Sequence, residues 1–204
     1  MQVERQVVRQ QPMPELSLRL RDDLVRLRQL LDVINTRNER IDVGLRSDAD
    51  AFEHTLQDVY FAEHAIAKAL PKIINAVSNA DLKTALKDHL TETKGQIKTL
   101  EAVFKSIGKK ASGEKCDAIE GLIKETEGVI EEAEGAVAKH AAIIGCCQAV
   151  EHYEISRYGT LREWAKALGE TKAHELLSEI LDQEKAANAK LTNIAVTEIN
   201  RPAK

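Results

Sequence analysis

The chain has 204 residues, of which 43% are hydrophobic and only 3% aromatic, and this composition predicts one compact core of aliphatic side chains. A formal net charge of −4 is unfavourable for binding phosphates, so we expect no nucleic-acid partner. The longest apolar run, residues 141–147, is much shorter than the roughly 20 residues of a membrane helix, and three cysteines that cannot all pair fit a reducing compartment. We therefore expect a cytoplasmic protein without a membrane segment.

The N-terminal part of the chain differs from the rest in its basic residues. All nine basic residues before Ser47 are arginine, whereas 17 of the 20 that follow are lysine. We therefore predict an arginine-rich extension over residues 1–46 and a main domain over residues 47–204. The extension contains one amphipathic helix with an apolar seam. This seam can pack on the main domain, pair with a second copy of the chain or bind a different partner. Because the seam offers a surplus apolar surface, we expect a homodimer. The seam consists of Leu20, Leu24, Leu27, Leu31 and Ile34.

The main domain has helical periodicity almost throughout, and no alternating strand pattern competes with it. Four long helices are predicted, over about residues 50–77, from a cap at Ser78 or Asn79 to about residue 107, and over about 138–168 and 171–199. A shorter helix is predicted over about residues 117–134, where Asp117 and Glu120 have the spacing of a capping box. Glycines that suit helix ends separate these segments, namely Gly108, Gly135 and Gly169.

Each long helix carries a glutamate on the stripe of residues that should face the core. An unpaired buried carboxylate costs several kcal/mol, so four inward carboxylates require compensation. Ferritin-like bundles meet this requirement with two metal ions held by glutamates and histidines from four helices. A ligand set rich in oxygen favours iron, with manganese as the alternative metal. The four residues are Glu63, Glu92, Glu151 and Glu184.

Three further polar residues lie near these glutamates on the predicted helix faces. His89 precedes Glu92 by three residues and can either coordinate a metal or form a hydrogen bond, while Gln96 can support Glu92 as a neighbouring amide. Glu154, three residues after Glu151, should share its face. A single glutamate near a helix stripe is more often a surface residue than a ligand, so the prediction rests on the four occurring together.

Six segments of the main domain match motifs of a known family in the same order. They are LQDVYFAE at 56–63, ALPK at 69–72, HLTETKGQ at 89–96, KCDAIEGLI at 115–123, VEHYEI at 150–155 and EKA at 184–186. The chain resembles the YciF family of bacterial ferritin-like proteins over most of residues 50–195, and the N-terminal extension lies outside this resemblance. The family implies an all-α fold, namely a ferritin-like antiparallel four-helix bundle with an additional short helix. It also implies a dinuclear iron site and a role in stress response.

The resemblance assigns metal ligation to the motif-matching acids Glu63, Glu92, Glu151 and Glu184, with His89, Gln96 and Glu154 as further candidates. No Glu-x-x-His motif occurs in the chain, so the implied ligand set is rich in oxygen.

Two classes of function follow from these inward acids. The first is redox chemistry at two iron ions that react with dioxygen or peroxide, as in an oxidoreductase of the ferroxidase or peroxide-reducing type. Tyr60 or Tyr158 can then donate an electron or simply fill space in the core. The second class is a helical interaction or structural protein, whose acids are paired or bind metal only for stability.

Overall fold

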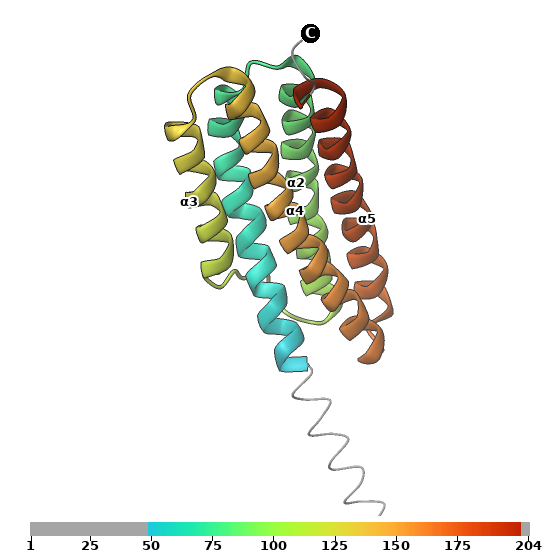
Figure 1. Cartoon of the computed structure of the whole chain (residues 1–204). Helices are drawn as coiled ribbons and strands as arrows, with labels where there is room; N and C mark the ends of the chain where they lie inside the picture. The colour runs from blue at the N-terminus through green and yellow to red at the C-terminus, as the bar shows by residue number, and fades with distance from the viewer. Residues whose placement is uncertain (1–48, 201–204) are drawn as a thin grey trace, which may run out of the picture. The chain divides into compact units, whose positions relative to one another are not determined.

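The computed structural model describes residues 49–200, and these form a bundle of long helices (Figure 1). The first helix covers residues 49–76 and is here called the 49–76 helix. It is followed by α2 (Ala80–Ser106), α3 (Asp117–Glu132), α4 (Ala136–Ala167) and α5 (Thr171–Ile194), and α5 continues into a π-helical turn, η1 (Ala195–Ile199). The described residues contain no strand, and the predicted all-α bundle is confirmed. The predicted N-terminal extension and its amphipathic helix lie outside the described residues.

The helix ends are set by the residues that the sequence predicts for them. The Asn79 side chain accepts a hydrogen bond of 2.9 Å from the Leu82 backbone N–H and so caps α2. Gly108, Gly135 and Gly169 have φ angles of 71°, 84° and 77°, which only glycine adopts without strain. These glycines follow α2, precede α4 and follow α4, respectively, as the sequence predicts.

The start of α3 agrees with the prediction, but its cap does not. The helix begins at Asp117, and its N-cap is Cys116, which makes no side-chain capping bond, so the predicted capping box of Asp117 and Glu120 is wrong. The Glu120 carboxylate lies instead 3.0 Å from the Lys115 ammonium in an exposed ion pair. The physical reason is tertiary packing: Cys116 is only 5% exposed, and its sulfur lies 3.0 Å from the Tyr153 hydroxyl on α4.

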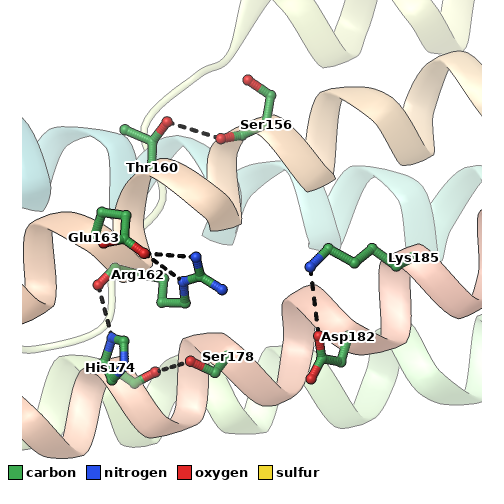
Figure 2. Close-up of polar contacts among 8 residues, drawn as sticks. All are labelled: Ser156, Thr160, Arg162, Glu163, His174, Ser178, Asp182 and Lys185. Carbon is green, nitrogen blue, oxygen red and sulfur yellow. Dashed lines mark hydrogen bonds and ion pairs between the residues drawn. The ribbon is translucent and has the colours of Figure 1, made fainter.

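The connection between α4 and α5 is tied by polar contacts on the surface of the bundle (Figure 2). His174, in the first turn of α5, hydrogen-bonds to the backbone carbonyl of Arg162 over 3.1 Å. The Arg162 guanidinium donates two hydrogen bonds to the neighbouring Glu163 carboxylate, at 2.6 and 3.0 Å. Of these contacts, the one made by His174 joins α5 to α4.

The core consists of two aliphatic clusters with a polar layer between them. Along each of the four long helices, residues of one cluster are followed by buried polar residues and then by residues of the other cluster. The Leu56 cluster includes Leu56, Val59, Leu100, Val103, Leu161, Leu177 and Ile180. The Ile66 cluster includes Ile66, Leu70, Leu82, Leu86, Ile143, Ile144 and Leu191. The carboxylate layer between them consists of Glu63, Gln96, Glu151, Glu154 and Glu184.

Candidate metal centre

Four glutamates from three helices converge in the carboxylate layer. Glu63 lies on the 49–76 helix, Glu151 and Glu154 lie on α4, and Glu184 lies on α5. All four are between 0% and 2% exposed. On α2, the His89 side chain is 12% exposed, and its Nε2 lies 3.6 Å from Glu151 Oε1. All four long helices therefore contribute to one buried cluster.

The cluster contains two groups of three residues that can each hold a cation. His89, Glu151 and Glu184 offer ligand atoms that all lie within 4.8 Å of one another, and Glu63, Glu154 and Glu184 do the same. Glu184 belongs to both groups. One carboxylate that faces two neighbouring groups is the arrangement that a bridging ligand of a dinuclear centre requires.

Neutral side chains orient two of these carboxylates. The Gln96 amide donates to Glu184 Oε1 over 2.5 Å and to Gln183 over 3.1 Å. The Tyr158 hydroxyl donates to Glu63 Oε1. Residues that hold a ligand in this way fix its rotamer and leave its second oxygen free for a metal.

Several buried polar atoms of this cluster have no hydrogen-bond partner among residues 49–200. Buried polar groups are normally paired, so these atoms are the ones free to accept a cation or a water. The atoms are Oε2 of Glu63, Glu151, Glu154 and Glu184, together with Nδ1 of His89 and Oε1 of Gln96.

The described lysines and arginines do not neutralise these acids. In the described part of the chain, His89 is the only basic side chain within ion-pair distance of any of the four carboxylates. Lys185, the residue next to Glu184, instead pairs with Asp182 over 3.7 Å on the exposed face of α5 (Figure 2). The buried acids therefore need either protons or metal cations.

Burial sets the protonation of the cluster. Burial raises the pKa of Glu63, Glu151, Glu154 and Glu184, and the neighbouring carboxylates raise it further. Burial lowers the pKa of His89 to about 4, so its imidazole is neutral near pH 7 and can donate a lone pair. Without a cation, most of these carboxyls hold their protons, and a cation that binds must displace them.

The structure corrects the predicted position of Glu92. The sequence places Glu92 on the inward stripe of α2, but its side chain is exposed, and the neighbouring Thr93 is 0% exposed. Leu86 and Gln96 are buried as predicted, but between them Thr93, and not Glu92, faces the core. Glu92 nevertheless lies beside the cluster, because its charge helps to raise the pKa of Glu151.

The other sequence-derived residues divide into two sets. The predicted ligands Glu63, Glu151 and Glu184 meet in the cluster, together with all three lesser candidates, His89, Gln96 and Glu154. Tyr158 is also there, as the hydrogen-bond donor to Glu63. Tyr60 is not, because its hydroxyl donates to Glu101 over 3.3 Å at the surface. Sequence reasoning missed the role of Tyr158 as an orienting residue, although it lies four residues after Glu154 on the same face.

The fold and this cluster define a class: a four-helix bundle with a buried centre of carboxylates and an extra helix at its side. Residues 47–204 match the family described as Domain of unknown function (DUF892). The protein YciF of Escherichia coli K12 is 43% identical over 162 residues, which cover 79% of this chain and 98% of YciF. The chain belongs to this YciF-type DUF892 family, and the resemblance seen in the sequence is confirmed.

Solved structures agree with this assignment. The crystal structure of the E. coli stress protein YciF matches with a TM-score of 0.73 and 44% identity, covering 76% of this chain and 98% of that one. YcfI of Rhodopseudomonas palustris, described provisionally as a structural protein, matches with a TM-score of 0.71 and 48% identity, covering 72% and 94% of the two chains. No helix among the described residues is both long enough and apolar enough to span a membrane.

Proposed function

We propose that this protein is a ferritin-like metal-binding protein with a carboxylate-bridged centre of two iron ions. The observation that carries the proposal is the pair of three-residue groups that share Glu184. Their free atoms are buried and unpaired among the described residues, as a preformed site for cations requires. Four ionised carboxylates also carry the charge that two divalent cations balance.

The residues present fit such a centre. His89 and Glu151 would hold one ion, Glu63 and Glu154 would hold the other, and Glu184 would contact both. Three of the four ligands outside Glu184 are carboxylates, so iron is the metal we propose and manganese the alternative. Gln96 and Tyr158 would keep Glu184 and Glu63 in place by the hydrogen bonds they already donate.

The chemistry of this centre would be the reduction of dioxygen or peroxide. When bound, two ferrous ions would supply the two electrons that, with two protons, convert dioxygen to hydrogen peroxide or hydrogen peroxide to two waters. The protein's own part is to exclude water by burial, to orient the carboxylates and to release their protons when metal binds. The Tyr158 hydroxyl holds a proton beside Glu63 throughout.

An anaerobic ferrous titration tests this proposal. We expect about two ions per chain for the natural protein and a loss of at least one site in Glu184→Gln, which keeps the shape of the side chain but removes its charge. Glu179→Gln is the matched control, because Glu179 lies on the exposed face of the same helix. Binding that is absent in the natural protein, or equal in Glu184→Gln and the control, would contradict the proposal.

A second function is favoured by a different observation. Burial raises the pKa of all four carboxyls, so the layer can remain neutral without metal, as in a structural or interaction protein. The description of YcfI as a structural protein agrees with this alternative. Failure to bind iron or manganese at neutral pH, together with an unchanged fold, would make it the better account.

We also propose that the protein acts in a stress response in the cytoplasm, as a homodimer. The relative from E. coli is described as a stress protein, which supports the first part. The dimer rests on the leucine seam of the extension, which lies outside the described residues. Light scattering at micromolar concentration should give twice the chain mass of 22.6 kDa, and a monomer mass would contradict the dimer.

A further inference from the structure

A small apolar cavity lies beside the candidate metal centre, between the 49–76 helix, α3 and α4. Its volume is about 30 Å³. Its inner end is formed by His89 and Glu151, two residues of the centre. Its outer end is formed by Ala69, Ile123 and Val150, which are only half-buried. The cavity therefore extends from near the surface to the proposed ligands.

The walls of this cavity offer almost nothing to a polar molecule. Apart from the two residues of the centre, only Thr126 and Cys147 carry polar atoms there. The Thr126 hydroxyl already donates to the Leu122 carbonyl over 2.8 Å, and burial raises the pKa of the Cys147 thiol to about 12, which keeps it neutral. A buried water needs two to four polar partners, which the cavity lacks away from His89 and Glu151, and apolar cavities accept xenon or other apolar molecules.

A second cavity reaches the same two residues from another side and, unlike the first, carries further charged side chains. It has a volume of about 90 Å³ and lies between α2 and α5, and its lining combines alanines and leucines with four polar residues, Glu92, His89, Glu151 and Lys190. Lys190 pairs with Asp88 over 2.7 Å, so its charge is compensated, whereas Glu92 is exposed and shows no partner of this kind among the described residues. A wider cavity with an acid at its rim attracts hydrated cations.

We propose that the apolar cavity is the site through which dioxygen reaches the centre, and that metal ions enter by the charged cavity instead. This inference rests on the proposed iron centre and adds a separate route for its substrate. It gives α3, the helix outside the four-helix bundle, a function: Ile123 and Thr126 form the wall that encloses the apolar cavity. A neutral diatomic molecule gains from such a lining, whereas a ferrous ion would lose its hydration there.

The test is to block the apolar cavity and to measure gas and metal separately. Ala69→Leu places three more carbon atoms in the cavity wall, and Ala149→Leu is the matched control, because Ala149 is exposed on α4 next to Val150. Val150→Ala should enlarge the cavity. Crystals pressurised with xenon report whether a gas enters, an anaerobic ferrous titration reports metal binding, and stopped-flow absorbance reports oxidation by dissolved dioxygen.

We expect xenon in the natural protein, in Ala149→Leu and in Val150→Ala, but not in Ala69→Leu. Ala69→Leu should bind ferrous iron as the natural protein does and oxidise it several-fold more slowly. Absence of xenon in the natural protein, or oxidation by Ala69→Leu at the natural rate, would overturn the proposed route for dioxygen but not the proposed metal centre. Absence of ferrous binding in the natural protein would overturn both.

Discussion

The two aliphatic clusters and the carboxylate layer between them are built on the same four helices but have opposite effects on stability. The clusters bury side chains such as Leu56, Leu100 and Leu177 to 0% exposure, and each contributes favourable transfer free energy. The layer buries four carboxyls equally well, and burial raises the pKa of every one. The clusters therefore stabilise the bundle, and the layer holds groups that are unfavourable there unless a proton or a cation compensates them.

The comparison supports the proposal that the layer binds a ligand. If the layer served only to fill space, aliphatic side chains would do so at lower free energy, as they do in the clusters on either side. Instead, Gln96 and Tyr158 orient two acids whose remaining oxygens face no partner among the described residues. The clusters fix the positions of the helices, and the layer uses those positions to bring the acids together.

The largest expected effect comes from breaking a cluster. Leu177→Ala removes a fully buried side chain from the Leu56 cluster and should lower the free energy of unfolding by about 3 kcal/mol. Urea denaturation monitored by circular dichroism measures the change. Metal stoichiometry at low temperature should stay the same, because Leu177 is not one of the proposed ligands. A loss below about 1 kcal/mol would show that the cluster is not tightly packed.

The second effect is a dependence of protein stability on pH, and the carboxylate layer sets its direction. The folded-state pKa of Glu63, Glu151 and Glu154 is raised above the ordinary value of 4.5, so folding binds protons and their contribution to stability is lost as pH rises. His89 has the opposite effect. Because burial lowers its folded-state pKa from 6.5 to about 4, His89 makes the protein more stable as pH rises toward 6.5. The three acids outnumber it, so metal-free protein should lose about 2 kcal/mol or more between about pH 5 and pH 8.

A variant tests this pH dependence within the same experiment. Glu154→Gln removes one titrating group from the layer and should make the urea midpoint less sensitive to pH, while raising it at about pH 8. The exposed Glu179→Gln should leave the pH profile unchanged. A metal-free protein that becomes more stable as pH rises over this range would contradict the assigned burial of the acids.

A smaller effect is expected from loosening an orienting residue. Gln96→Ala removes the hydrogen bond to Glu184 and should cost about 1 kcal/mol of stability. Ferrous affinity should fall roughly tenfold to 100-fold, with stoichiometry unchanged, because the ligands themselves remain. Isothermal titration calorimetry under anaerobic conditions separates affinity from stoichiometry. Unchanged affinity would show that Gln96 does not orient Glu184.

The smallest effect is expected outside both the clusters and the layer. Glu120→Ala breaks only an exposed ion pair with Lys115 and should change stability by about 0.5 kcal/mol or less. Metal content should not change. Asn79→Ala, which removes the observed cap of α2, should cost about 1 kcal/mol and serves as the reference for a real cap. Equal losses in the two variants would contradict the reassignment of Glu120.

Local sequence signals predicted most of the fold and part of the site. Gly108, Gly135 and Gly169 mark helix ends because their φ angles are positive, and that requirement is visible in the sequence as glycine itself. Periodicity could not decide whether Glu92 or Thr93 faces the core, because neighbouring residues on a helix differ by only about 100° around its axis.

Contacts between distant residues were beyond the reach of these signals. Tyr158 and Glu63 are 95 residues apart, and the burial of Cys116 depends on Tyr153 of another helix. Such pairings arise only when the helices have packed, so neither the orienting role of Tyr158 nor the missing side-chain cap of α3 could be predicted from local patterns.

Anomalous scattering at the iron absorption edge, from crystals soaked anaerobically in ferrous iron, tests the central claim most directly. We predict two peaks inside the bundle, one beside His89 and Glu151 and the other beside Glu63 and Glu154, with Glu184 in contact with both. Peaks confined to surface acids, or no peak in the carboxylate layer at near-neutral pH, would contradict the claim that this layer is a metal centre.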